Sequence, residues 1–297
     1  MFFALILAAT AVAQAQAIKV TDDIGTVFTF PAPPSRIISL APNITEVLFA
    51  LGLGDRIIAV TRYCDYPEAA QAKGHIGGML DPDIERIKAL SPDLIVAFRG
   101  NPLNALAKLR ELGLPVFTLD IHGGIDAVPG MVAKIGAVTG RTAQADAIRD
   151  GLAAKERAVA TALASVRTIP RVFLSLQGSG LWTFGRESYF NDLLSRAKAV
   201  SVTAGLGKAW LEYSREALIK DDPDAIVVLA QTGDQFRAAV RWFEGQAGLN
   251  RLRAVREKRF LHLDQNAASR FGPRLYDALA ALARRLHPEA FPPPTRR

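Results

Sequence analysis

The sequence contains little cysteine and little histidine, which limits the metal and redox chemistry open to it. Its 297 residues include one cysteine, Cys64, so an intramolecular disulfide and a multi-cysteine metal site are both excluded. The four histidines, His75, His122, His262 and His287, show none of the short spacings typical of zinc motifs. We therefore expect no metal site built from protein side chains alone and no resident cofactor.

The sequence also lacks the short motifs of common enzyme sites. Ser175 and Ser179 have no nucleophile-elbow pattern around them, and Gly77-Gly78 does not continue as a phosphate-binding loop. Asp65 and Glu187 are isolated carboxylates with no evident partner for acid–base chemistry. We therefore expect no catalytic residues and a protein that is not an enzyme. A two-lobed enzyme that handles a cofactor is the weaker alternative class.

Charge of one sign is not concentrated anywhere in the chain. There are 36 basic and 29 acidic residues, a formal net charge of +7, and no run of five basic residues. Nucleic-acid binding needs a clustered basic patch or stripe, so we expect no nucleic-acid partner. Hydrophobic residues make up 49% and charged residues 22%, which is typical of a globular protein. The length is sufficient for two lobes of ordinary domain size.

Long apolar runs are absent, because no stretch reaches the roughly 18 residues of a membrane-spanning helix. Residues 1–17 (MFFALILAATAVAQAQA) carry no charge and combine a short apolar core with small-x-small patterns ending at Ala13 and Ala17. This is typical of a signal peptide, although its basic n-region is missing. We expect export and cleavage after Ala13 or Ala17. A short buried or amphipathic N-terminal helix is the alternative.

Apolar, β-favouring runs alternate with helical patterns along most of the chain. After a short hairpin, strands are expected at residues 36–40, 57–61, 93–98, 115–119, 171–176, 225–229 and 259–263. Helices are expected at residues 45–51, 82–90, 101–112, 188–197, 234–244 and 273–286. Such alternation is typical of parallel sheets whose two faces are covered by helices.

Residues 142–166 interrupt this alternation. They are rich in Ala, Lys, Arg, Glu and Gln, and they indicate a single helix about 36 Å long. A helix of this length can join two lobes as a rigid strut. The sequence therefore predicts an α/β protein with two Rossmann-like lobes, residues 18–141 and 167–297, joined by a helix at 142–166. The ligand cleft is expected between the lobes.

The two halves share a short internal repeat. Glu85 precedes Pro92-Asp93 by seven residues, Glu216 precedes Pro223-Asp224 by seven, and an Ile-Val strand follows in both halves. A helix–turn–strand unit repeated in the same register implies two lobes of similar build. Each glutamate then lies at an equivalent place near a helix start. The helix dipole alone favours an acid there, so a purely structural role is the open alternative.

Seven short motifs occur along the chain. Each alone is weak, but their order and spacing together are specific for a group of proteins. They are RIISLAPNITE (36–46), YCDYP (63–67), LSPDL (90–94), AFRGN (97–101), FGRES (184–188), YSRE (213–216) and RFGPR (270–274). Over residues 36–286 the chain resembles the periplasmic cobalamin-binding proteins of ABC importers, which belong to a larger group for cobalamin, haem and iron–siderophores. The resemblance implies two α/β lobes joined by a long helix, with cobalamin or a related corrinoid as the transported ligand. It also implies a periplasmic protein, which we expect to be a monomer.

Aromatic residues near strand ends are candidates for the walls of the cleft. Cobalamin is a broad disc with flat faces and an amide-bearing rim, so it needs aromatic walls and a few polar groups. The candidates are Tyr63, Tyr66, Phe98, Trp182, expected just past a strand, and Trp210, expected in a glycine-rich loop. The resemblance implies ligand contact for Phe98, Trp182 and Trp210 in particular. Ordinary core packing is the alternative for each.

Polar candidates flank these aromatics. Arg99, with Gly100 beside it, and Arg270 are candidates for holding carboxylate or phosphate groups, with loop bracing as the alternative. Cys64 either faces the ligand or fills a buried gap. The chain has Gly77-Gly78 where the cobalamin binders have a tryptophan, so haem or a ferric siderophore stays open as the ligand.

The resemblance assigns a docking role to the repeated glutamates. In the resembled family, glutamates at the positions of Glu85 and Glu216 pair with arginines of the membrane subunits. An importer with two similar membrane subunits presents two similar docking sites, which a pseudo-two-fold pair of acids matches. The partner implied is the permease dimer of an ABC importer.

Overall fold

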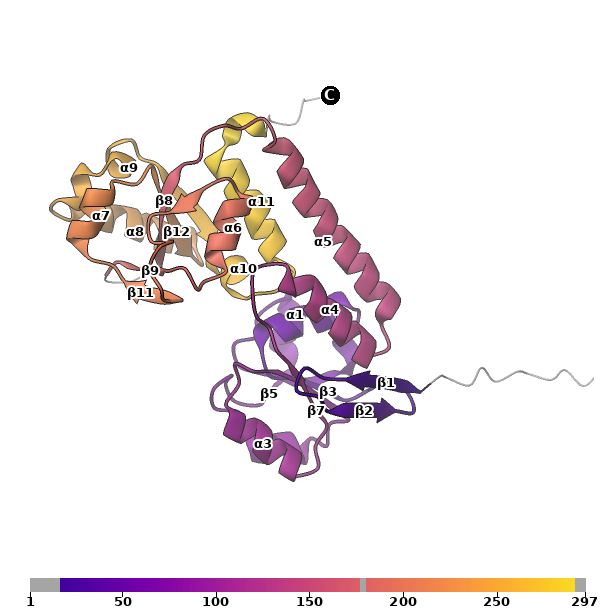
Figure 1. The fold of residues 1–297 in the computed structure, drawn as a ribbon. Coiled ribbons are helices and arrows are strands. Elements are labelled where there is room, and N and C mark those ends of the chain that lie inside the picture. The colour runs from indigo at the N-terminus through magenta and orange to yellow at the C-terminus, as the bar shows by residue number, and fades with distance from the viewer. Residues whose placement is uncertain (1–16, 177–179, 292–297) are drawn as a thin grey trace, which may run out of the picture.

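Two parallel sheets carry the fold, one in each lobe, as the alternating pattern predicts (Figure 1). The computed structural model describes residues 17–176 and 180–291. The predicted signal peptide therefore lies outside the described residues apart from Ala17. Within the described ranges, no helix combines the length and the apolar character that crossing a bilayer requires.

The N-terminal lobe is built on a five-stranded parallel sheet with the strand order β5-β4-β3-β6-β7. Its strands are β3 (Ile37–Ser39), β4 (Ile57–Val60), β5 (Gly74–His75), β6 (Leu94–Phe98) and β7 (Val116–Leu119). Its helices are α1 (Pro42–Ala50), α2 (Ile84–Ala89) and α3 (Leu103–Glu111). The central strands β3 and β6 are almost wholly buried, which explains why they are continuous apolar runs. An antiparallel hairpin, β1 (Ile18–Thr21) and β2 (Val27–Phe30), precedes this sheet.

The C-terminal lobe is built on a four-stranded parallel sheet with the order β10-β8-β12-β13. Its strands are β8 (Arg171–Leu176), β10 (Val200–Ser201), β12 (Ala225–Ala230) and β13 (Phe260–Asp264). Its helices are α6 (Phe190–Arg196), α7 (Arg215–Asp221), α8 (Gly233–Gly245), α9 (Arg253–Arg256), α10 (Gln265–Ser269) and α11 (Leu275–Leu286). Short 3-10 helices lie at Gly54–Arg56, Glu68–Ala72, Leu249–Arg251 and Pro288–Ala290.

A small antiparallel sheet lies where the sequence predicted no strand. Strand β9 (Trp182–Phe184) pairs with β11 (Trp210–Glu212), so that Trp210 lies opposite Phe184. The expectation that Trp210 lies in a loop was wrong. Each strand has three residues, too few for a period of two to be visible, although aromatic residues favour strands.

Two long helices, α5 (Thr142–Ala162) and α11, lie on the side where the lobes are joined (Figure 1). Helix α5 begins at the predicted residue and ends four residues before Val166. It packs against α11 and against α4 (Ala127–Val138), a helix that the sequence reasoning missed. Pro129 and Gly130 argue against a helix there, but a proline in the first turn of a helix sacrifices no hydrogen bond.

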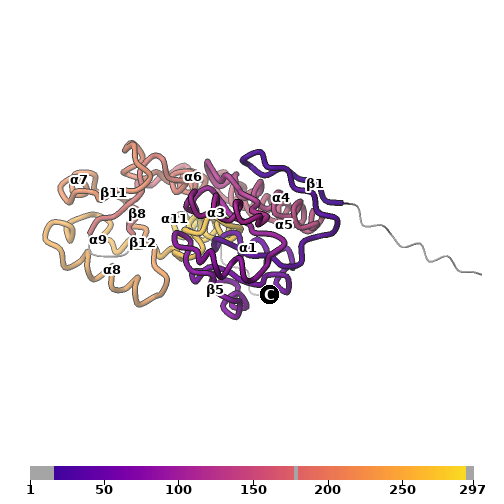
Figure 2. The backbone as a smooth tube through the Cα atoms, turned by 90° about the horizontal axis from the view of Figure 1, so that it is seen from below, coloured from indigo at the N-terminus to yellow at the C-terminus, as the bar shows by residue number. Residues whose placement is uncertain are grey.

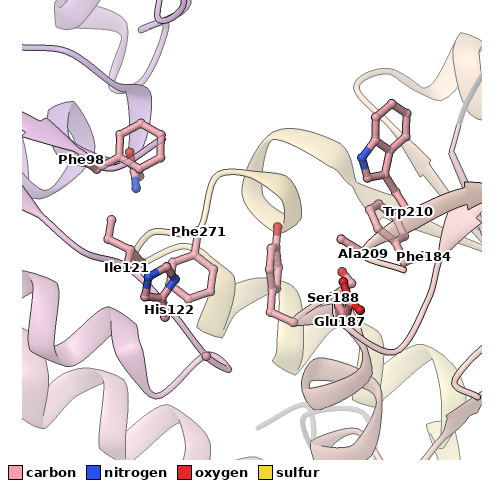
Figure 3. A pocket seen from close by; sticks show the side chains of 12 residues that line it. Phe98, Ile121, His122, Phe184, Glu187, Ser188, Ala209, Trp210 and Phe271 are labelled. Carbon is pink, nitrogen blue, oxygen red and sulfur yellow. The ribbon is translucent and has the colours of Figure 1, made fainter. Parts of the chain in front are cut away.

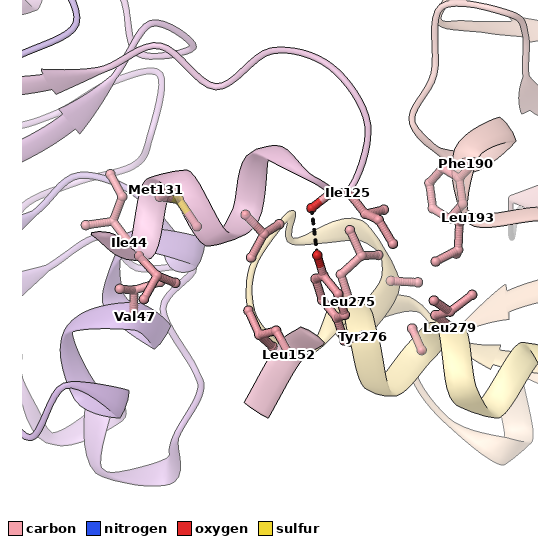
Figure 4. Close-up of a cluster of buried hydrophobic side chains, with 14 of the residues drawn as sticks. Ile44, Val47, Ile125, Met131, Leu152, Phe190, Leu193, Leu275, Tyr276 and Leu279 are labelled. Carbon is pink, nitrogen blue, oxygen red and sulfur yellow. Dashed lines mark hydrogen bonds between the residues drawn. The ribbon is translucent and has the colours of Figure 1, made fainter. Parts of the chain in front are cut away.

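The lobes share part of one apolar core (Figure 4). The cluster contains Ile44 of α1, Met131 of α4, Leu152 of α5, Phe190 of α6 and Leu275 of α11. In the same cluster the Tyr276 hydroxyl donates to the carbonyl of Ile125, at 3.3 Å. Figure 2 shows the two lobes side by side with α11 between them. Opening the lobes widely would expose this shared apolar surface to water, so the packing favours small interlobe movements.

The internal repeat forms the same structure in both lobes. The Asp93 carboxylate accepts a hydrogen bond from the backbone N–H of Arg36 at 2.8 Å, just before β3. The Asp224 carboxylate accepts one from the backbone N–H of Arg171 at 2.7 Å, at the start of β8. Each aspartate therefore fixes the beginning of the central strand beside it, and the two lobes have the same build around this turn.

Candidate functional site

A cavity of about 440 Å³ lies between the lobes, and aromatic side chains from both lobes line it (Figure 3). The N-terminal lobe contributes Asn43, Phe98, Ile121, His122 and Gly123. The C-terminal lobe contributes Phe184, Glu187, Ser188, Tyr189, Ala209, Trp210 and Phe271. On the N-terminal side these residues end β6 or follow β3 and β7, at the carboxyl edge where open α/β sheets bind ligands. The volume is within the usual range for a small-molecule site.

Apolar walls face each other across the cavity. Figure 3 shows Phe98 and Ile121 on one side and Trp210 and Phe184 on the other. The ring of Tyr189 meets that of Phe271 edge-on, with centroids 4.9 Å apart, and its hydroxyl donates to the carbonyl of Ala268. Because Tyr189 is largely buried, desolvation raises the pKa of its hydroxyl. Two opposed aromatic walls suit a ligand with flat faces.

Two of the five predicted aromatic residues, Phe98 and Trp210, line the cavity. The side chain of Trp210 is open to solvent, with 62% of the residue exposed. Trp182 is not among the lining residues, but its ring centroid lies 5.3 Å from that of Trp210. The structure therefore offers Trp182 a supporting role behind Trp210.

The Phe98-Arg-Gly-Asn101 motif has a structural explanation. The buried Asn101 amide accepts from the backbone N–H of Phe98 and donates to the carbonyls of Leu40 and Met79, each at 3.0 Å. A Cβ on Gly100 would lie 2.1 Å from the Phe98 ring, so only glycine leaves room for that ring. Gly100 and Asn101 thereby hold Phe98 at the wall of the cavity.

The two predicted tyrosines are not among the lining residues. Tyr63 and Tyr66 are about half exposed, and each is covered by an arginine. The guanidinium of Arg62 lies 5.2 Å from the Tyr63 ring centroid, and that of Arg274 lies 3.9 Å from the Tyr66 ring centroid. Ligand contact by these two tyrosines stays a prediction. In the structure each ring instead makes a cation–π contact with an arginine.

Arg270 bridges the lobes and does not line the cavity. It forms a bidentate ion pair with Asp65, with Nη2 at 2.8 Å from Oδ2, and it also donates to Asn266. The interpretation of Asp65 as a carboxylate without a partner was wrong. Hydrogen bonding to Arg270 lowers the pKa of Asp65, which keeps the carboxyl charged.

A second ion pair between the lobes is more deeply buried. Glu46 of α1 accepts a hydrogen bond from Nε of Arg274, at 3.0 Å, immediately before α11. Glu46 is 5% exposed. Burial raises the pKa of Glu46, and the hydrogen bonds and charge of Arg274 act in the opposite direction. The two lobes therefore meet through a buried charged pair beside the cavity as well as through the apolar core.

Arg99, a predicted anion-binding residue, is paired within its own lobe. Its Nη1 lies 2.6 Å from Oδ2 of Asp120, which follows β7. The other oxygen of Asp120 contacts Nε2 of His122, and His122 lines the cavity. Arg99 thus holds a carboxylate that in turn contacts a histidine of the cleft.

Of the two roles considered for Cys64, facing the ligand or filling a buried gap, the structure shows the second. Its sulfur lies 3.1 Å from the hydroxyls of both Thr45 and Thr61, and the residue is 3% exposed. Burial raises the pKa of the thiol, which disfavours the reactive thiolate.

Several lining residues were missed by the sequence reasoning. Ile121 and His122 follow β7 closely, so the rule that selected Phe98 at the end of β6 applies to them as well. Phe184 and Phe271 lie inside the motifs FGRES and RFGPR, in which other positions were weighed. Their side chains became candidates only when the fold placed both motifs beside the cavity.

Glu85 and Glu216 occupy equivalent positions in the two lobes. Each lies in the first turn of its helix, α2 or α7, behind an N-cap residue, Asp83 or Ser214. Both are exposed, and neither forms an ion pair within the described part of the chain. In a parallel α/β unit the helix starts lie at the carboxyl edge of the sheet, which is the edge that carries the cleft.

Two similar α/β lobes, a connecting helix and an aromatic cavity between the lobes define a substrate-binding protein. The chain belongs to the periplasmic binding protein family, whose model matches residues 37–267. Members of this family are binding proteins and not enzymes.

Relatives and solved structures agree with this assignment. The vitamin B12-binding protein of Yersinia pestis (strain Pestoides F) is 34% identical over 204 residues, which cover 67% of this chain and 71% of that protein. The structure of the periplasmic vitamin B12-binding protein of Vibrio cholerae has a TM-score of 0.76 and 27% identity, covering 88% of this chain and 100% of the other. The apo periplasmic haem-binding protein from Roseiflexus sp. RS-1 has a TM-score of 0.78 and 25% identity, covering 86% and 99%. These comparisons confirm the predicted fold class and the resemblance to this group of binding proteins.

Proposed function

We propose that the protein captures cobalamin or a related corrinoid in the periplasm and delivers it to the membrane permease of an ABC importer. The observation that carries the choice of ligand is the charge of the cavity. Among the described residues that line it there is one carboxylate, Glu187, and no lysine or arginine. Such a lining suits a ligand whose rim is neutral and rich in hydrogen-bond donors.

The charge of the lining separates the candidate ligands. A haem carries two propionate carboxylates, which are usually held by arginine or lysine and would be repelled by Glu187. The amide groups on the rim of a corrinoid can donate to Glu187 and can exchange hydrogen bonds with Asn43 and Ser188. The lining therefore favours a corrinoid over haem or an anionic ferric siderophore.

The arginines predicted to hold an anion are already paired. Arg99 pairs with Asp120 and Arg270 with Asp65, so an anionic ligand would have to break an existing ion pair to use either one. Separating such a pair leaves an aspartate without its partner, which costs free energy. Like the charge of the lining, this pairing therefore favours a ligand with a neutral rim.

The assignment predicts that the mature protein binds cyanocobalamin one to one. Calorimetric titration is expected to give saturable heat with cyanocobalamin and much weaker binding with haemin. The visible absorption of each complex provides an independent count of bound ligand, because both compounds are coloured. The ligand must be recovered unchanged after release, which separates a binding protein from an enzyme. Saturable binding of haemin without binding of any corrinoid would transfer the assignment to haem.

Removing the exposed wall of the cavity is expected to weaken binding. Trp210→Ala should cost about 1–3 kcal/mol of cyanocobalamin binding free energy, the usual scale for an aromatic anchor. Trp182→Ala should also weaken binding, because Trp182 packs behind Trp210 in the paired strand β9. Trp210→Phe retains a flat ring and is expected to recover most of the loss. Titration of the three variants, each checked by circular dichroism, measures these effects; parental affinity in Trp210→Ala would place the ligand elsewhere.

A further inference from the structure

We propose that His122 binds the metal at the centre of the captured corrinoid through an axial position, and that Asp120 and Arg99 hold the imidazole ready for this bond. This inference rests on the proposed function and adds to it the side chain that binds the metal of the ligand. It arises from one feature of the cavity, a histidine on an aromatic wall whose ring contacts a fixed carboxylate.

The three side chains form a continuous chain of contacts. Nη1 of Arg99 lies 2.6 Å from Oδ2 of Asp120, and Oδ1 of Asp120 contacts Nε2 of His122. Histidines that bind metals usually donate their other ring N–H to a carboxylate or carbonyl, which fixes the tautomer and makes the binding nitrogen more basic. Oδ1 of Asp120 is buried and has no hydrogen-bond partner of standard geometry among the described residues, so the Nε2–H of His122, which it already contacts, is the donor within reach. Nδ1 is then the nitrogen left to bind a metal.

Asp120 is anchored firmly enough to orient the imidazole. Its side chain is 18% exposed, and its backbone N–H donates to the Asp23 carboxylate at 2.7 Å. Asp23 also forms an ion pair with Lys134 of α4. The carboxylate is therefore fixed from both its backbone and its side chain, whereas the His122 side chain is 75% exposed and accessible from the cleft.

The composition of the site indicates what kind of metal it can bind. Within the described residues there is no group of three or more His, Cys, Asp or Glu side chains that could hold a free metal ion. One imidazole in an aromatic cavity instead suits a metal whose four equatorial positions are already filled by a macrocycle. A corrinoid brings its cobalt in this form, so that only the axial positions are available for ligand exchange.

The bond is a ligand exchange on cobalt(III) without a change of oxidation state. In aquocobalamin the lone pair of Nδ1 forms a bond to cobalt, and the cobalt–oxygen bond breaks as water leaves. In cyanocobalamin the strongly bound cyanide blocks this exchange. The protein should therefore bind aquocobalamin more tightly than cyanocobalamin, by about tenfold or more, the scale on which metal sites respond to changes in their ligand shell.

Visible spectroscopy and titration with the two cobalamins test the proposal. On addition of the protein, the spectrum of aquocobalamin should change to that of an imidazole complex, and the spectrum of cyanocobalamin should keep its cyanide form. In His122→Ala the spectral change should disappear and the ratio of the two affinities should fall to about one. Asp120→Asn should retain the bond but reduce the ratio, because the amide orients the ring less strongly. His75→Ala, an exposed histidine in β5, is the matched control and should behave as the parent.

The outcomes distinguish this inference from the proposed function. If the parent binds both cobalamins with equal affinity and His122→Ala gives the same spectra, the axial role is wrong and the corrinoid assignment stands. If the parent binds neither cobalamin, both proposals are overturned. Circular dichroism of each variant confirms that the fold is retained.

Discussion

Replacing both Glu85 and Glu216 by alanine is expected to remove most of the protein's stimulation of its importer, by more than about tenfold. Removing one partner of a desolvated interfacial charge pair typically costs about 2–5 kcal/mol, and here one pair would be lost on each lobe. Neither glutamate lines the cavity, so the affinity for cyanocobalamin should stay near that of the parent. The effect is measured as ligand uptake by vesicles that contain the reconstituted importer. The ligand-loaded protein is added on the side of the membrane that corresponds to the periplasm.

The structure supports a docking role through the equivalence of the two positions. Each glutamate is exposed in the first turn of the helix that precedes a Pro-Asp turn, and that turn has the same hydrogen bonding in both lobes. Two similar membrane subunits would therefore meet the same acid in the same local setting. Charge-assisted pairs with arginine also fix the orientation of the docked protein.

The alternative is that both acids serve only the helix dipole. In that case their loss would cost about 0.3–1 kcal/mol of stability each and leave uptake unchanged. A control that removes one exposed acid from each lobe, Glu68→Ala with Asp234→Ala, separates charge from position, because both acids also lie in first helical turns. The control should transport normally. Parental uptake by the Glu85/Glu216 double variant, shown to be folded and loaded, would exclude docking.

Arg274→Gln is expected to destabilise the protein by about 3–5 kcal/mol at neutral pH. This is the usual cost of removing one partner of a buried ion pair, because the other charge, here Glu46, is left buried without compensation. The substitution also removes the guanidinium that covers the Tyr66 ring. Urea unfolding, with the midpoint and slope fitted for parent and variant, measures the difference. Arg285→Gln, an exposed arginine near the end of the same helix, is the control and should cost less than about 1 kcal/mol.

The deficit of Arg274→Gln should depend on pH in a defined direction. Burial raises the pKa of Glu46 in the folded protein, and loss of Arg274 removes the influence that opposes this rise. A raised folded-state pKa means that neutral Glu46 contributes stability that is complete below its ordinary pKa and is lost as the pH rises through the folded value. The variant should therefore approach the parent near about pH 4 and fall behind it as the pH increases. A deficit that is independent of pH, or that grows on acidification, would contradict this account.

The sequence by itself determined the α/β class, the two lobes and the family. These features follow from local patterns in the sequence. The patterns are apolar runs such as that of β6, the helix-favouring composition that begins at Thr142, and the equal residue spacing of the internal repeat. The hydrogen bonds of the Pro-Asp turn are not local, because they reach a strand start 57 residues away in one lobe and 53 in the other. Such local patterns can be recognised without the structure, because backbone geometry and burial impose them on each strand and helix separately.

Only the tertiary structure decided which of the predicted residues face the cavity. Arg270 and Asp65 are 205 residues apart in the sequence, and nothing local to either indicates that they neutralise each other across the lobes. The packing of the lobes also leaves Tyr63 and Tyr66 out of the lining and brings in His122, Phe184 and Phe271. Side-chain type marks these residues as able to bind a ligand. Whether they do so depends on the packing of the two lobes against each other, which places some of them at the cleft and pairs others, such as Arg270, with charges from a distant part of the chain.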